Sequence, residues 1–182
     1  MRIAVSGAHF SGKSTLIASL LKSLPNYVSI EEPYFLLEEE GYEFSDPPSL
    51  EDFEEQCARS VREIEESASN TLLDRCPFDF LAYAQALIKE PLSIEHWTQA
   101  MEDAIDRLDL IIFVPVEEKD RIRVPQSEDM ELRETVDQTL REFLLDDSLG
   151  LLKNLEVLEV TGPLEKRVQI VKEYLSERQK PI

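Results

Sequence analysis

Cysteine is scarce in this sequence, which excludes a cysteine-based metal-binding domain and a disulfide-stabilised fold. Only Cys57 and Cys76 occur among 182 residues, and their spacing matches no metal-binding motif. Two thiols provide no disulfide framework, so we expect a reducing compartment. The sequence also lacks an apolar run of about 18 residues, the length a membrane-spanning helix needs, and shows no signal peptide. These absences predict a cytoplasmic protein without membrane partners.

Basic side chains are the second scarcity. The chain has 19 Lys and Arg against 38 Asp and Glu, a formal net charge of -19. Nucleic acids and anionic membranes attract basic surfaces, so neither is expected as a general partner. A phosphorylated ligand would need a local basic cluster that works against the overall field. No internal repeat is present, and the length favours one domain over residues 1–182.

Glycine is scarce too, yet two of the five glycines lie in one short segment. An apolar run at residues 3–5 precedes this segment, and an apolar stripe of helical spacing at residues 16–21 follows it. A strand before and a helix after are the context that the Walker A motif GxxxxGK[ST] requires. The match is complete and reads Gly7-Ala8-His9-Phe10-Ser11-Gly12-Lys13-Ser14-Thr15.

Each residue type in this phosphate loop (P-loop) has a physical use. Gly7 and Gly12 let the backbone approach an anion, so that successive N–H groups can surround phosphates. The helix that begins near Lys13 adds its unpaired amides, the Lys13 ammonium reaches the terminal phosphates, and the Ser14 hydroxyl is a ligand for Mg²⁺. We expect His9 to contribute only its backbone, with its ring facing solvent. The segment therefore predicts an ATP and Mg²⁺ site.

The rest of the hydrophobic pattern predicts an α/β fold. Short apolar runs indicate parallel strands, and helical stripes separate them. Ser49 and Asp52 form a capping box that starts one of these helices, and Phe53 or Arg59 of that helix are candidates to touch a substrate. The strands are expected at residues 2–6, 26–30, 71–73, 110–116 and 155–160.

Acidic side chains follow the second and third predicted strands. Glu31 and Glu32 come directly after residues 26–30, and Asp74 follows residues 71–73. Ligands of open α/β sheets bind beyond the carboxyl ends of the strands, so these carboxylates are site candidates. For Glu31 and Glu32, a solvated turn that continues into the acidic stretch at residues 38–40 is an equally good explanation.

A charged stretch after the fourth strand is a candidate lid. Arg121 and Arg123 lie in it, and Arg133 lies in the helix that follows. Solvated surface charge is the ordinary explanation of such a run. Basic residues are scarce here, however, and these three lie where a loop could close over phosphates. We therefore expect a lid at about residues 117–130.

With these residues, the chain resembles the nucleoside and nucleotide kinases of the P-loop superfamily. The segment from Asp74 to Tyr83 is similar to the Asp-Arg segment of thymidylate kinases and of AAA-type ATPase/kinase domains related to ribosylnicotinamide kinase. Glu32-Pro33 is similar to the Glu-Pro of deoxynucleoside kinases, in which the Glu is the base. Gln85 lies one position later than the Gln of thymidylate kinases, which disfavours thymidylate as the acceptor.

The resemblance implies a three-layer P-loop fold with a mainly parallel five-stranded sheet, and transfer of the ATP γ-phosphoryl to a nucleoside, a nucleotide or a similar small molecule. It implies that Lys13 holds the β- and γ-phosphates, that Ser14 and Asp74 bind Mg²⁺, and that Arg75 grips acceptor or phosphate. Glu32 and Asp74 are rival bases. Such chemistry consists mainly of positioning and charge neutralisation.

The resemblance also assigns roles near the lid. Arg121, Arg123 and Arg133 would stabilise the transferring group, and Thr161 and Gly162 would lie near adenine. A different class of function is an ATP-binding regulatory or interaction ATPase with no small-molecule acceptor. The acids at two strand ends and the arginines of the lid favour the kinase, because a simple switch does not need them. The acceptor and the oligomeric state stay open at this point.

Overall fold

The computed structural model describes residues 1–87, 93–117 and 122–178, and its centre is a parallel five-stranded sheet. The strand order is β2-β3-β1-β4-β5, and all four neighbouring pairs are parallel. The predicted α/β fold is therefore confirmed. The strands are β1 (Arg2–Ser6), β2 (Val28–Ile30), β3 (Thr71–Asp74), β4 (Leu110–Phe113) and β5 (Val157–Glu159).

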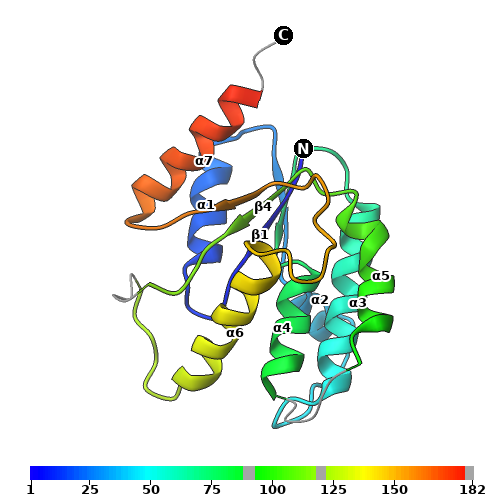
Figure 1. Ribbon diagram of the computed structural model, residues 1–182. Helices are drawn as coiled ribbons and strands as arrows, with labels where there is room; N and C mark the ends of the chain where they lie inside the picture. The colour runs from blue at the N-terminus through cyan, green and yellow to red at the C-terminus, as the bar shows by residue number, and fades with distance from the viewer. Residues whose placement is uncertain (88–92, 118–121, 179–182) are drawn as a thin grey trace.

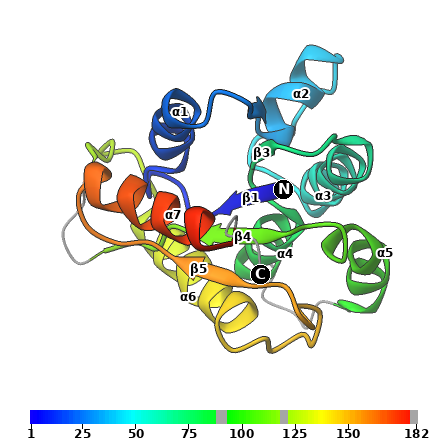
Figure 2. The same ribbon diagram turned by 90° about the horizontal axis from the view of Figure 1, so that it is seen from above.

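Helices cover both faces of this sheet and make three layers. Figures 1 and 2 show α1 and α7 together on one face, with α3, α4, α5 and α6 on the other. The helices are α1 (Lys13–Ser23), α2 (Pro33–Glu39), α3 (Leu50–Glu66), α4 (Pro77–Leu87), α5 (Glu95–Ile105), α6 (Met130–Leu144) and α7 (Leu164–Arg178). Among the described residues, no helix is long and apolar enough to cross a membrane.

The alternation of side chains along β1 divides the core between these layers. Ile3 and Val5 belong to the cluster under α1 and α7, whereas Ala4 packs in the cluster under the other helices. All three are fully buried, as expected for a central parallel strand with both faces covered. The P-loop follows β1 directly, so the core fixes the place from which it starts.

Several elements differ from the sequence prediction: β2 and β5 are shorter than the expected residues 26–30 and 155–160, and two further differences have a local cause. The fourth strand ends at Phe113 and not at Val116, since Pro115 has no N–H to donate and the Val116 N–H is bonded to Asp137 instead. The acidic stretch after β2 is not a plain turn, because Pro33 begins the short helix α2. A proline suits the first turn of a helix, where its missing N–H would have no partner.

The predicted capping box at the start of α3 is present. The Asp52 N–H donates to Ser49 Oγ at 3.2 Å, and the Ser49 N–H donates to Asp52 Oδ2 at 2.7 Å. These two bonds satisfy amides that the helix leaves unpaired.

Candidate active site

The P-loop curves between β1 and α1 in a backbone conformation that needs its glycines. Gly12 has φ 98°, in the left-handed region, and a Cβ on Gly7 would collide with the carbonyl oxygen of Val114. Lys13 is the first residue of α1, and its Nζ donates to the Ala8 carbonyl at 2.9 Å. Burial and the nearby Arg75 lower the pKa of Lys13 to about 8. The ammonium is thus held inside the curve of the loop.

Asp79 of α4 anchors this loop to the segment between β3 and α4. Its Oδ1 accepts the Gly7 N–H at 3.0 Å, and its Oδ2 accepts the Cys76 N–H at 3.0 Å. The carboxylate is fully buried and also lies 3.4 Å from Nη1 of Arg75. Asp79 therefore ties the P-loop to the segment that follows β3.

Arg75 joins the P-loop to the acid after β2. Its Nε donates to the Glu32 carboxylate, and its Nη1 donates to the Gly7 carbonyl at 3.2 Å. Burial alone would raise the pKa of Glu32, but the charges of Arg75 and Lys13 together lower it. Of the two acids after β2, the structure thus brings Glu32 to the loop, whereas Glu31 is exposed.

Ser14 and Asp74 form a second pair at the end of the loop. Ser14 Oγ donates to Asp74 Oδ2 at 2.9 Å, and the other oxygen, Oδ1, is buried and has no hydrogen-bond partner among the described residues. Burial raises the pKa of Asp74 despite the opposing charges of Lys13 and Arg75. No group of three metal-ligating side chains occurs in the described ranges. A hydroxyl beside a carboxylate fits Mg²⁺, which usually takes few protein ligands and completes its shell with phosphate and water.

A cavity of about 580 Å³ opens beside Glu32 and Arg75. Two aromatic pairs stand in its wall: Tyr34 stacks on Phe44 at 4.3 Å, and Phe53 stacks on Tyr83 at 5.8 Å between ring centres. Of the two helix α3 candidates, Phe53 lines the cavity, whereas Arg59 is paired with Glu40 and Glu63. Its other lining residues are His9, Phe35, Ser45, Asp46, Pro48, Asp52, Gln56 and Phe80.

His9 takes part in the site with more than its backbone. Its N–H donates to the Tyr83 hydroxyl at 2.9 Å, and its ring lies 4.8 Å from the Tyr83 ring, at the edge of the cavity. Although half of the side chain is exposed, partial desolvation and the charges of Arg75 and Lys13 lower the pKa of His9, so the imidazole is neutral at pH 7. The His9 side chain is 48% exposed, so the expectation of a solvent-facing ring is confirmed, and the same ring also lies against Tyr83.

The three arginines expected to act on the transferring group lie in different places. Arg121 lies outside the described residues, and Arg123 is exposed. Arg133 is buried on α6, where its Nε donates to the His9 carbonyl at 2.9 Å and its Nη2 to the Phe10 carbonyl at 3.2 Å. The structure thus places Arg133 against the backbone of the P-loop and not in a segment that closes over it.

Arg167 is a contact residue that the sequence reasoning missed. It lies on α7, and it donates to the Ser11 carbonyl at 2.7 Å and to the Gly162 carbonyl at 2.9 Å. The available signal was a basic side chain within the apolar stripe of the last helix, in a chain with few basic residues. Asp79 was also missed. The available signal was an acidic residue four positions after Arg75, close enough in sequence for an ion pair.

A smaller cavity of about 290 Å³ lies on the other side of the P-loop, towards α7. Gly12 and Thr15 line it from the loop, and Gly162 lines it from the turn after β5. The Gly162 N–H donates to Glu117 at 2.5 Å, and this bond fixes the turn to the segment that follows β4. Thr161 precedes this turn and is not among the lining residues.

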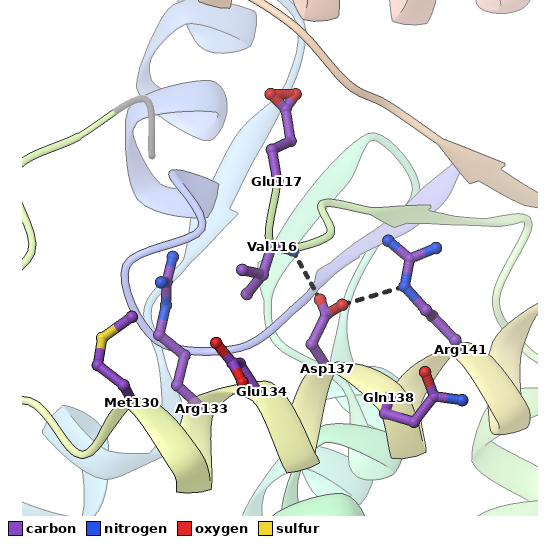
Figure 3. Close-up of a pocket in the computed structure, with 8 residues that line it drawn as sticks. All are labelled: Val116, Glu117, Met130, Arg133, Glu134, Asp137, Gln138 and Arg141. Atoms are coloured by element: carbon purple, nitrogen blue, oxygen red, sulfur yellow. Dashed lines mark hydrogen bonds and ion pairs between the residues drawn. The ribbon is translucent and has the colours of Figure 1, made fainter. Parts of the chain in front are cut away.

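A polar cavity of about 450 Å³ runs along α6, where Figure 3 shows the side chains that surround it. Asp137 accepts the Val116 N–H at 2.7 Å and also binds Arg141 at 3.0 Å. Arg141 in turn contacts Glu159 at 3.0 Å. These contacts fix the chain where it leaves β4 and runs towards Glu117.

Comparisons with known proteins agree with this geometry. A family model described as an AAA domain matches residues 2–167. Among solved structures, deoxyadenosine kinase from M. mycoides with bound dATP has a TM-score of 0.70 at 16% identity, covering 97% of this chain and 99% of that chain. Thymidylate kinase from Candida albicans has a TM-score of 0.64 at 16% identity, covering 98% and 92%.

A third solved structure is similar over its full length. It is the YorR protein from Bacillus subtilis in complex with phosphorylated GDP, with a TM-score of 0.65 at 16% identity and complete coverage of both chains. No curated protein matches the sequence significantly. The structural likenesses show that the chain has the fold of nucleoside and nucleotide kinases.

Proposed function

The chain belongs to the AAA domain family, and we propose that it is a kinase that transfers the γ-phosphoryl of Mg-ATP to a small acceptor in the 580 Å³ cavity. The observation that carries this proposal is that one residue, Arg75, joins the P-loop to the cavity. Arg75 contacts the Gly7 carbonyl of the P-loop and also lines the cavity beside Glu32. A regulatory ATPase needs the loop but has no use for an acceptor cavity at this place.

The P-loop would bind the phosphates of ATP. Arg133 and Arg167 bind carbonyl groups of His9, Phe10 and Ser11, so the loop is held from both sides at its carbonyls. This support favours a fixed loop whose N–H groups stay available to an anion. Lys13 would add the charge that attracts the β- and γ-phosphates.

Mg²⁺ would be held by Ser14 and Asp74. The support for this assignment is the hydrogen bond from Ser14 to Asp74 Oδ2 and the buried Asp74 Oδ1, which has no partner in the part of the chain that the structure describes. When bound, Mg²⁺ neutralises charge on the β- and γ-phosphates. The protein would supply two ligands for the ion, the Ser14 hydroxyl and the Asp74 carboxylate, next to the phosphate-binding loop.

Glu32 is our choice for the base, because it lines the acceptor cavity and Asp74 does not. Its lowered pKa keeps Glu32 ionised at neutral pH, so it can accept a hydrogen bond from an acceptor hydroxyl. Arg75 fixes the Glu32 carboxylate through its Nε. Asp74 is occupied by Ser14, which suits a role at the metal.

The remaining assignments concern the lid and the adenine side. We propose that Arg121 and Arg123 stabilise the transferring phosphoryl group, because they are the two arginines of the stretch at 117–130. Thr161 and Gly162 are proposed at the adenine side, since Gly162 lines the smaller cavity next to the loop. We also propose a single domain over residues 1–182 in the cytoplasm, where buried free thiols such as Cys57 and Cys76 are common.

The test is acceptor-dependent turnover. Purified protein is incubated with Mg-ATP and, one at a time, with nucleosides, nucleotides and other hydroxyl metabolites, and ADP release is measured. At least one compound should raise ADP release and carry the phosphate, and Lys13→Ala should abolish both. Hydrolysis that no compound stimulates would favour the regulatory ATPase instead.

A further inference from the structure

The shape of the acceptor cavity suits a flat ring compound. The stacked pair Tyr34 and Phe44 lines it, and the Phe35 ring centre lies 5.3 Å from that of Tyr34. A second aromatic pair, Phe53 and Tyr83, also lines the cavity, with ring planes 7° apart. Aromatic walls of this kind bind planar rings by stacking and by burial of apolar area.

The charges of the same cavity are mostly negative. Three carboxylates line it, Glu32, Asp46 and Asp52, and among the described lining residues Arg75 is the only permanent cation. The Asp52 carboxylate is fixed by the Ser49 N–H at 2.7 Å and by the Tyr42 hydroxyl at 3.1 Å. Burial alone would raise the pKa of Asp52, but the hydrogen bonds to its carboxylate outweigh this effect. The pKa is lowered overall, so Asp52 stays ionised.

Arg75 is already neutralised by the protein's own carboxylates. Its side chain is 2% exposed, its Nε is bonded to Glu32, and its Nη1 lies 3.4 Å from Asp79. Binding of phosphate by arginine relies on a guanidinium that offers two parallel N–H groups. A phosphate in this cavity would have to compete with two carboxylates for a guanidinium that is already engaged.

His9 does not supply the missing positive charge. Its half-exposed ring lines the cavity, and partial desolvation and the positive charges of Arg75 and Lys13 lower its pKa, so the imidazole is neutral at pH 7. A phosphate ester with about two negative charges would therefore meet a surplus of carboxylates. A compound that ends in a free hydroxyl would meet the acceptor of a hydrogen bond, Glu32.

We infer that the acceptor is a planar ring compound with a free hydroxyl and no phosphate group, and that the cavity rejects its phosphorylated form by charge. This inference rests on the proposed function for the role of the cavity. It narrows the substrate class to nucleoside-like compounds, neutral or cationic, and assigns Asp46 as a residue that determines this specificity.

The experiment compares binding of matched pairs. The probes are adenosine, guanosine, cytidine, uridine and thymidine, each with its own 5′-monophosphate, titrated by calorimetry in the presence of Mg²⁺ and a non-hydrolysable ATP analogue. We expect at least one nucleoside to bind about tenfold or more tightly than its monophosphate at low salt. A monophosphate that binds as tightly as its nucleoside, or the failure of every probe to bind, would overturn the inference.

Two charge-reversing variants in one loop sharpen the comparison. Asp46 lines the cavity, whereas Glu43 is exposed in the same loop and is not among the lining residues. Asp46→Lys should narrow the preference for the nucleoside by about three- to tenfold, and Glu43→Lys should leave it unchanged. Equal effects of both variants would indicate a general field and would contradict the assignment of Asp46.

Transfer of label from [γ-³²P]ATP separates this inference from the proposed function. Label on a nucleoside supports both. Label on a monophosphate supports the kinase and contradicts the inference about the acceptor. A nucleoside that binds with the expected preference but never receives label contradicts the kinase, while the charge selectivity of the cavity stands.

Discussion

The carboxylate of Asp79 accepts the backbone N–H of Gly7 at 3.0 Å, across 72 residues of sequence. Its other oxygen accepts the N–H and the thiol of Cys76, so that one buried side chain holds the P-loop and the start of α4 together. A charged acceptor with several donors is stronger than a neutral one, and its loss leaves the donors without partners.

Asp79→Asn should therefore destabilise the protein. The amide keeps the size of the side chain but lacks the charge that pairs with Arg75, and it presents one oxygen in place of two. We expect the free energy of unfolding to fall by about 2–3 kcal/mol in urea denaturation. Asp103→Asn, an exposed position on α5, is the control and should change it by less than about 0.5 kcal/mol. Equal stabilities of the two variants would contradict the anchor role.

Lys13 should make nucleotide binding depend on pH. Its pKa of about 8 lies below the ordinary 10.5, because the charged form is buried. Phosphates need the ammonium, so above pH 8 binding must take up a proton, and affinity for Mg-ATP should fall by up to about tenfold per pH unit. In the unliganded protein the sign is opposite. The unfolded chain binds more protons between pH 8 and 10.5, so this group makes stability rise across that window.

Calorimetric titrations with Mg-ATP from pH 7 to 9.5 check this prediction. Lys13→Arg keeps its charge over the whole range and should bind with little dependence on pH, whatever its absolute affinity. Lys22→Ala, at the exposed end of α1, should behave like the parent. A parent protein whose affinity is constant from pH 7 to 9.5 would show that the Lys13 charge is not what the nucleotide requires.

Glu32 and Asp74 should respond differently to loss of charge. Glu32 faces the acceptor cavity and Asp74 is hydrogen-bonded to Ser14, so we assign the base to Glu32 and the metal to Asp74. Glu32→Gln should keep Mg-ATP binding and lose about 10²–10⁴-fold in phosphoryl transfer. Asp74→Asn should raise the Mg²⁺ concentration that gives half activity. If Glu32→Gln transfers normally and Asp74→Asn is inactive at every Mg²⁺ concentration, the roles are reversed.

The sequence predicted those parts of the molecule that depend on neighbouring residues. The P-loop, the capping box at Ser49 and the order of strands and helices follow from local pattern, and the rule that ligands bind at strand ends drew attention to Glu32 and Asp74. The rule works because parallel strands end at one edge of the sheet. It therefore placed Ser14 and Asp74 near each other although 60 residues separate them.

Contacts made by buried polar side chains were beyond such rules. Asp79 and Arg167 bind backbone groups 72 and 156 residues away, and no local pattern encodes which carbonyl or amide a buried charge will reach. Arg133 illustrates the same point. Its charge and its position after the lid suggested that it stabilises the transferring phosphoryl group. In the structure, its guanidinium donates to the carbonyls of His9 and Phe10. The acceptor cavity likewise depends on loops that meet only in the folded chain.

Arg167 should control nucleotide affinity through the backbone of the P-loop. Its guanidinium bridges the Ser11 carbonyl of the P-loop and the Gly162 carbonyl of the neighbouring turn, with Glu117 at 3.8 Å. Arg167→Met fills a similar volume but donates nothing, so the Ser11 peptide is free to rotate. We expect the Kd for Mg-ATP to rise about 10- to 100-fold in calorimetry, with an unfolding free energy lower by about 1–3 kcal/mol.

Arg167→Lys separates a role in positioning from a role in stability alone. Lysine keeps the charge beside Glu117, but its single ammonium cannot span two carbonyls as a planar guanidinium does. Arg167→Lys should therefore recover most of the stability and little of the ATP affinity, whereas Arg107→Met, at an exposed position, should change neither. If Arg167→Met is less stable but its folded fraction binds Mg-ATP as the parent does, the bridge serves only the fold. If Kd rises and Arg167→Lys fails to restore it, the two-carbonyl bridge sets the loop.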